Sequence, residues 1–199
     1  AGDVIPDIVS VLKDLRTGKE KEFVWPKFVS DCGGSGEIER VPGQAAWKCK
    51  NKNSFIQKKR KLYHFAGKHA FDIDGLGPKI IDQLLQAELV ATADDFVTLK
   101  KGDLLSLPRF AEKSVDNLLS AIQNRKEISL PRFIISLSIP QVGEETAYLL
   151  AENFGSIAKL QNCKIENLES IDGIGPIVAK SIVDWFFEKQ NKKQVEKLL

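Results

Sequence analysis

The sequence predicts a mainly α fold in which one helical unit is repeated four times. From residue 62 onward, apolar residues recur at helical spacing and are punctuated by turns that contain glycine and proline. Two of these turns are nearly identical, DGLGPK from Asp74 and DGIGPI from Asp172. The contents of 43% apolar and 28% charged residues are those of an ordinary globular protein. A small irregular module and a β edge are predicted to precede the helices.

Residues 1–24 are expected to form the β edge. Their apolar, β-branched start is interrupted by Pro6, which favours the edge of a sheet because proline cannot donate a ladder hydrogen bond. Residues 25–61 are richer in glycine and in polar and basic side chains, and no helix or strand pattern of useful length appears there. We therefore expect residues 25–61 to form a small module without a large core.

Residues 62–199 contain four turns at near-constant spacing. The turns open at Gly75, Arg109, Gln141 and Gly173, so that successive openings are 34, 32 and 32 residues apart. A period of this size is typical of repeated supersecondary units, each too small to bury its own apolar face. We therefore expect the four units to pack together in one all-α domain.

The glycine-rich turns have the composition of a phosphate site. Gly75 and Gly77 bracket the apolar Leu76, and Pro78 follows; the fourth turn repeats this pattern. Glycine permits a positive φ and a close approach by another backbone, and proline suits the first position of a helix. The apolar side chain can turn inward and fix the turn. The result is a helix N-terminus whose free N–H groups and dipole favour an anion.

The other two turns are degenerate copies. Arg109 and Gln141 replace the opening glycine, and Lys79 and Lys180 follow the glycine-rich turns in what we expect to be the first turn of each next helix. Such sites grip a nucleic-acid backbone and carry no sequence information. The candidate DNA-binding residues of the four turns are Gly75, Gly77, Lys79, Arg109, Lys113, Gln141, Gly143, Gly173, Gly175 and Lys180.

The turns have two other interpretations. Each turn can be a sharp connection that binds nothing, with the degenerate copies serving mainly as packing partners. A dinucleotide site is excluded because no strand precedes the glycines and the third glycine of the fingerprint is missing.

The turns GLGPK and GIGPIVAKS resemble helix-hairpin-helix motifs, which contact DNA without reading its sequence. Together with HFAGKHAFDIDGLGPKIIDQL, VGEETAYLLAENFGSI and DWFFEKQNKKQVEKL, they resemble the C-terminal part of NAD⁺-dependent, bacterial-type DNA ligases. AGDVIP is similar to the end of that family's OB domain. The resemblance covers essentially the whole chain in the family's order. It implies a monomer that grips nicked double-stranded DNA, with the OB and adenylation domains as neighbours in the same chain.

The family has a four-cysteine zinc finger between its OB domain and its hairpins. Cys32 and Cys49 match its second and third cysteines, whereas Val29 and Ser54 stand where the first and fourth should be. A structural zinc site needs four ligands, so these are vestigial positions and we expect no metal. The module should instead be held by packing of Phe23, Trp25, Phe28, Trp47 and Phe55. Three cysteines in a chain of this size also lead us to expect no disulfide framework.

A basic run, QKKRK, follows the module. Its cations are either a solvated face or a phosphate-contacting patch whose effect weakens with salt. We include them as DNA-binding candidates, namely Lys58, Lys59, Arg60 and Lys61.

The charge balance limits the mode of binding. The net charge is +2, with 13 basic and 8 acidic residues through Gly67 and 16 against 19 from Lys68 onward. A binder that uses its whole basic surface is therefore excluded, and contacts must be local. No apolar run is long enough to span a membrane, and no signal-like stretch is present, so we expect a cytoplasmic protein.

The resemblance implies part of an enzyme that is inactive by itself. In the family an adenylate is carried on the lysine of a Lys-x-Asp-Gly motif, and no such tetrapeptide occurs here. No catalytic residue is therefore assigned, and NAD⁺ and Mg²⁺ are expected to serve the full-length enzyme. Two alternatives stay open: a tandem-hairpin DNA-binding module of another repair protein, and a protein-interaction scaffold, which the acidic balance after Gly67 favours.

Overall fold

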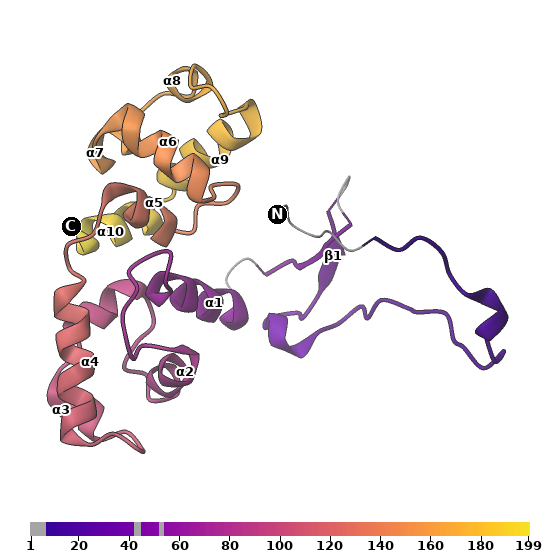
Figure 1. Cartoon of the computed structure of the whole chain (residues 1–199), viewed down its shortest axis with the longest axis horizontal. Helices are drawn as coiled ribbons and strands as arrows, with labels where there is room; N and C mark the ends of the chain where they lie inside the picture. The colour runs from indigo at the N-terminus through magenta and orange to yellow at the C-terminus, as the bar shows by residue number, and fades with distance from the viewer. Residues whose placement is uncertain (1–6, 42–44, 52–53) are drawn as a thin grey trace. The chain divides into compact units, whose positions relative to one another are not determined.

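The computed structural model describes residues 7–41, 45–51 and 54–199, which belong to two compact units divided between Asn51 and Lys52 (Figure 1). The division lies ten residues before the predicted limit at residue 61, which falls inside a helix. The assignment of residues 1–24 to an OB domain stays a prediction. The AGDVIP segment lies outside the described residues.

The first unit is built around a two-stranded antiparallel sheet. Strands β1 (Ile38–Arg40) and β2 (Trp47–Cys49) pair with Glu39 opposite Lys48. The short 3-10 helices η1 (Lys13–Leu15) and η2 (Ser30–Cys32) precede them. The predicted β edge is not seen in residues 7–24, which are exposed and contain η1 but no strand. A strand needs a neighbour to complete its hydrogen bonds, and none of the described residues supplies one.

A disulfide closes the first unit. Cys32, at the end of η2, is bonded to Cys49, at the end of β2, and their Cα atoms are 5.6 Å apart. The expectation of no disulfide is therefore wrong for this pair. Spacing along the chain did not reveal it, because the hairpin of β1 and β2 brings together two cysteines that are 17 residues apart.

Aromatic packing in the first unit agrees only in part with the prediction. Trp25 stacks on Trp47 with ring centroids 5.1 Å apart, and Phe23 meets the edge of Trp25. Phe28 covers Gly36 so closely that a Cβ there would overlap its ring. Phe55 does not belong to the first unit, because it begins a helix of the second and is exposed.

The second unit is all α-helical apart from turns (Figure 1). Four helix–turn–helix hairpins follow one another, and each turn joins a pair of helices. Besides these pairs, η3 (Ala93–Thr98) and α7 (Ile157–Gln161) lie in connections between hairpins, and α10 (Lys189–Leu198) follows the fourth hairpin. The hairpin helices are α1 (Phe55–Ala66) with α2 (Pro78–Gln86), α3 (Lys101–Leu105) with α4 (Glu112–Asn124), α5 (Leu130–Ser136) with α6 (Glu144–Phe154), and α8 (Ile165–Glu169) with α9 (Pro176–Phe187).

Helix α1 corrects the expectation that residues 25–61 are irregular. Ser54, almost fully buried, is its N-cap, and the Ser54 side chain accepts a hydrogen bond of 3.3 Å from the backbone N–H of Gln57. A serine N-cap satisfies one of the unpaired N–H groups of a helix start. The basic run QKKRK therefore lies inside a helix.

The four hairpins share one core. Leu104, Leu150, Leu168 and Ile182 have no exposed surface, and each comes from a different helix. Phe65 of α1 stacks on Phe71 and on Phe96 of η3. The predicted mutual packing of four small helical units is confirmed.

Candidate nucleic-acid interface

The four turns are equivalent in backbone geometry. Gly75, Arg109, Gln141 and Gly173 all have a positive φ, of 78°, 68°, 68° and 86°. Non-glycine residues seldom adopt this conformation, so its occurrence at Arg109 and Gln141 identifies both as opening positions. The prediction of four equivalent turns from their spacing is confirmed.

The residue after each opening position fixes the turn to the core. Leu76 and Ile174 are buried, and Phe110 and Val142 are half-buried. The backbone N–H of each donates to the carbonyl three residues earlier, over 3.2 Å for Leu76 to Ile73 and 3.0 Å for Ile174 to Ile171. The acceptor residues of all four turns are buried and apolar, namely Ile73, Leu107, Ile139 and Ile171. The predicted inward direction of the bracketed side chain is therefore confirmed for the two glycine-rich turns.

The next residue is the N-cap of the following helix. Gly77, Gly143 and Gly175 cap α2, α6 and α9, and no side chain caps these helices. A Cβ placed on any of the three glycines would meet no atom within 4 Å. The N-cap positions of these helices are therefore open and carry no side-chain cap, as an anion site requires. Helix α4 differs, because Ala111 is its cap and its N–H donates to the Ser114 hydroxyl.

The hairpins associate in two pairs, each with one glycine-rich and one degenerate turn. In the first pair, the Gln83 amide makes a long contact of 3.5 Å with the carbonyl of Pro108. In the second, the Ser181 hydroxyl donates to the carbonyl of Pro140 over 2.6 Å. Gln83 and Ser181 both lie eight residues after the opening glycine, and both carbonyls directly precede the degenerate opening residue.

The glycine turns also pack on the partner hairpin. From the position of a Cβ on Gly75, Leu118 of α4 would be 3.9 Å away, and from one on Gly173, Leu149 of α6 would be 3.3 Å away. The two opening glycines therefore face the long helix of the degenerate hairpin in their own pair.

A cavity of about 420 Å³ lies between the two turns of the first pair. Lys79 and Arg109 line it from opposite turns. Both are exposed, and neither forms an ion pair with the part of the chain that the structure describes. Gln83, Ser114 and Asn117 also line it and were not among the predicted residues. Gln83 and Asn117 share a sequence signal, because each lies eight residues after the opening residue of its turn; this spacing becomes informative only once the pairing of the hairpins is known.

The two pairs differ in charge at the second residue of the helix that follows each turn. This residue is Lys79 and Lys113 in the first pair, but Glu145 and Ile177 in the second. Lys180, predicted to lie in the first turn of its helix, is the fifth residue of α9 and binds Asp184 over 2.9 Å. The second pair therefore has glycine amides at Gly175 but no free cation at this position.

The third turn is the least suited to phosphate. Glu144 and Glu145 begin α6, where their charges oppose an anion at the same helix end. His69 Nδ1 lies 2.6 Å from a carboxylate oxygen of Glu144. The exposed Gln141 opens this turn and brings no charge.

The basic run of α1 does not form one patch. Lys58 and Lys61 line a second cavity, and Arg60 is exposed. Lys59 Nζ is 2.8 Å from Asp82 of α2, and the Tyr63 hydroxyl donates to the same carboxylate. The hydrogen bonds from Lys59 and then from Tyr63 lower the pKa of Asp82, and the bond with Asp82 raises the pKa of Lys59. Lys59 thus joins α1 to α2. The run forms no single patch because side chains of successive helical residues point in different directions.

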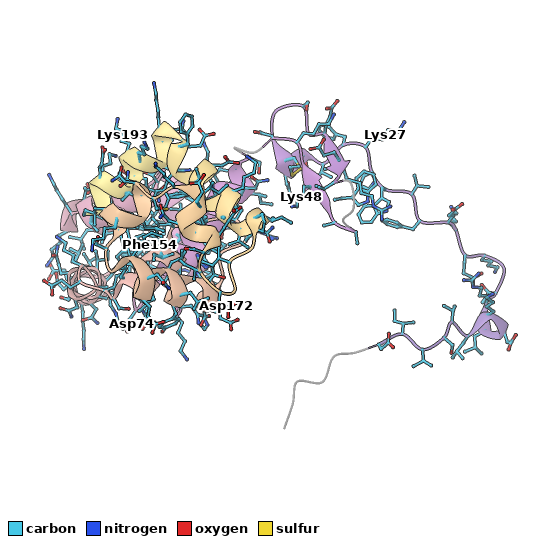
Figure 2. All side chains as sticks on the ribbon, turned by 90° about the horizontal axis from the view of Figure 1, so that it is seen from above. Lys27, Lys48, Asp74, Phe154, Asp172 and Lys193 are labelled. Carbon is cyan, nitrogen blue, oxygen red and sulfur yellow. A yellow bond between two sulfur atoms is a disulfide. The ribbon has the colours of Figure 1, made fainter. Side chains whose placement is uncertain are left out.

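The glycine-rich turns lie along one side of the second unit. Figure 2 shows Asp74 and Asp172, each directly before an opening glycine, on the same side, with Lys193 of α10 on the opposite side. The two glycine-rich turns therefore lie on the same side of the second unit in this view.

No group of three or more histidine, cysteine, aspartate or glutamate side chains is placed to hold a metal ion within residues 7–41, 45–51 and 54–199. Over the same ranges, no helix has the length and apolar character required to cross a membrane.

The matches with known families divide the second unit between the second and the third hairpin, which is also the boundary between the two hairpin pairs. Residues 69–124 match the family described as SAM-like helix-hairpin-helix tandem. Residues 132–195 match the family described as helix-hairpin-helix motif. The first match spans one pair of turns and the second match spans the other. Tandem helix-hairpin-helix domains are therefore present, and they indicate a capacity to bind DNA.

Proposed function

We propose that this chain holds duplex DNA by its sugar–phosphate backbone, without reading base sequence. The observation that carries the proposal is the equivalence of four turns that open at a positive φ, with open space above three glycine N-caps. Free amides at a helix start bind phosphate oxygens. Lys79, Arg109 and Lys113 of the first pair add cations beside the starts of α2 and α4. Contacts of this kind position a protein on DNA and carry no sequence information.

We further propose that the chain is the DNA-clamping part of an NAD⁺-dependent DNA ligase that acts on nicked duplexes in replication and repair. The order of motifs from AGDVIP to DWFFEKQNKKQVEKL supports this assignment. In this proposal the chain positions the nick, and adenylation, with NAD⁺ and Mg²⁺, is the work of other domains of the same chain. The absence of a Lys-x-Asp-Gly tetrapeptide is consistent with this division.

A scaffold that binds protein instead of DNA is the second candidate. The carboxylates of Glu144 and Glu145 at the third turn favour it, because they oppose phosphate at the start of α6. So does the exposed side chain of Ile177, which stands where the first hairpin has Lys79. Both features lie in the second pair. The free cations of the first pair support DNA as the ligand.

Alanine at the glycine caps tests the proposal without disturbing the fold. Gly77 and Gly175 have φ near −80°, which any residue adopts, and an added Cβ would meet no atom within 4 Å. We expect Gly77→Ala and Gly175→Ala to fold normally, and the added methyl groups to keep phosphates from the amides. Affinity for a fluorescent nicked duplex, measured by anisotropy, should fall about tenfold in the double variant, the loss of one or two backbone contacts.

Gly102→Ala is the matched control, since Gly102 lies in α3 with equal open space and is not part of a turn. It should leave DNA affinity unchanged. Two duplexes of unrelated sequence should bind equally well. If the double cap variant binds nicked duplex as tightly as the unaltered chain, the turns are not the contact surface and the scaffold becomes the better explanation.

A further inference from the structure

A second basic cavity lies in the second unit, away from the turns. It has a volume of about 410 Å³ and is lined by residues of α1, of η3 and the segment before it, of the end of α5, of α9 and of α10. Lys58 and Lys61 enter it from α1, and Lys193 and Lys197 from α10. Asp94 is the one acidic residue among those that line it.

Most of this positive charge is not compensated. Lys197 is paired with the buried carboxylate of Asp94, a contact that joins α10 to η3. Lys58, Lys61 and Lys193 form no ion pair within the described ranges of the chain. The cavity therefore carries an excess of three positive charges from two helices.

The remaining walls supply hydrogen-bond donors above an apolar floor. Gln190 and Gln194 of α10 line the cavity with their amides, and the largely buried Leu62, Phe65 and Trp185 lie beneath. Phe65 is already stacked on Phe71, so its face is not available to a ligand ring. The recognition chemistry of the cavity is therefore charge and hydrogen bonding.

The cavity is separate from the hairpin face. Figure 2 shows Lys193 on the side of the second unit opposite to Asp74 and Asp172. A duplex held by the glycine-rich turns lies on the other side of the unit from Lys193. The clustering of the lysines is consequently not explained by the proposed contact at the turns.

We propose that this cavity binds the phosphate groups of a ligand that carries several negative charges close together. Three ammonium groups with amide donors between them match phosphate oxygens in charge and in hydrogen bonding. A single carboxylate would leave most of the positive charge unpaired. Two sources supply the required chemistry: a free polyphosphate, or the backbone of a nucleic-acid strand other than the duplex at the turns.

Calorimetric titration of the 199-residue chain with tripolyphosphate tests the proposal. The variant Lys61→Gln/Lys193→Gln removes one cation from each helix and should weaken binding at least about tenfold. The control Arg60→Gln/Lys189→Gln removes the same charge from the same helices at residues that do not line the cavity. The control should change the affinity less than about twofold, as expected for screened surface charges.

A parallel titration with a short single-stranded oligothymidylate distinguishes the sources. Weakening of both ligands by the cavity variant assigns the site to strand phosphates, and weakening of tripolyphosphate alone assigns it to a free ligand. The proposal is overturned if tripolyphosphate does not bind, or if the cavity variant and the control weaken it equally. Duplex binding at the turns is measured separately with Gly77→Ala/Gly175→Ala, so the two proposals fail independently.

Discussion

Asp72 adopts a positive φ of 52° three residues before the first opening glycine, and two arginines hold it there. Arg125 donates to the Asp72 carbonyl over 3.0 Å and to its carboxylate over 2.6 Å. Arg132 donates to the carbonyls of Ala70 and Lys68 over 2.8 and 2.7 Å. Aspartate tolerates this conformation better than most residues. The two guanidinium groups therefore fix the backbone that leads into the first turn.

Arg132→Ala should loosen this segment. It removes two hydrogen bonds from a charged donor to backbone carbonyls, which contribute roughly 1–3 kcal/mol in total at a partly exposed site. Urea unfolding should show a loss in this range, whereas Arg60→Ala on the exposed face of α1 should cost less than about 0.5 kcal/mol. Equal losses in the two variants would show that Arg132 does not hold the segment.

Among single residues, the sequence predicts those of the turns better than the arginines that hold the backbone before the first turn. The spacing of the repeats identifies Arg109 and Gln141 as opening positions, although neither is glycine, and both have the positive φ of that position. The role of Arg132 could not be predicted, because it acts on carbonyls more than 60 residues earlier and no local pattern marks such a contact.

At the scale of helices, the second hairpin pair is not a copy of the first. Lys79 and Lys113 occupy the second position of α2 and α4, whereas Glu145 and Ile177 occupy it in α6 and α9. A cation at this position lies beside the free N–H groups and adds to their attraction for phosphate. The first pair should therefore provide most of the electrostatic part of DNA binding.

The salt dependence of binding tests this difference. Each cation that neutralises a phosphate contributes about 0.9 to the slope of log affinity against log salt. The variant Lys79→Gln/Lys113→Gln should therefore reduce the slope by about 2 for duplex DNA. Lys189→Gln/Lys192→Gln, in α10, should leave the slope within about 0.5 of its value. An equal reduction by both variants would mean that bulk charge, not the first pair, binds the duplex.

The helices themselves were predictable where apolar periodicity is strong and less so where charge dominates. The sequence does not predict helix α1 over residues 55–61, because QKKRK conceals the apolar face that Leu62 and Phe65 continue. Ser54 is a sequence signal for the start of this helix, although the family resemblance places a lost cysteine ligand at the same position.

The whole chain consists of two units with different sources of stability. The second has a continuous core that all four hairpins share. The first has the Cys32–Cys49 disulfide, a stacked pair of tryptophans and a two-stranded sheet. A sheet of two strands is marginal by itself in water. The first unit should therefore depend on its disulfide.

Reduction of the disulfide should act on the first unit alone. A cross-link between residues 17 apart stabilises a unit by about 3 kcal/mol in the chain-entropy treatment. In Cys32→Ser/Cys49→Ser, the near-ultraviolet circular dichroism of Trp25 and Trp47 should be lost at a lower denaturant concentration. The far-ultraviolet signal, which comes from helices of the second unit, should unfold as before. A shift of the helical transition would show that the units are coupled.

The arrangement of the second unit was predictable from the sequence, and the first unit was not. The turn occurs four times at regular spacing, so a single departure from the glycine pattern, such as Gln141, does not hide the repeat. The first unit offers no repeat, and its pairing of Cys32 with Cys49 depends on a hairpin of three-residue strands.

Along the chain the turns run glycine-rich, degenerate, degenerate, glycine-rich, so Gly77 and Gly175, the caps of the two glycine-rich turns, belong to the first and last hairpins of one compact unit. If both caps bind phosphate as proposed, the protein is bivalent toward a duplex long enough to reach both. When one cap dissociates from its phosphate, the other keeps the DNA at a high local concentration near it. The first cap then rebinds faster than the second dissociates. Residence time on DNA is then set by the rarity of simultaneous release, and a duplex too short to span both caps should leave disproportionately fast.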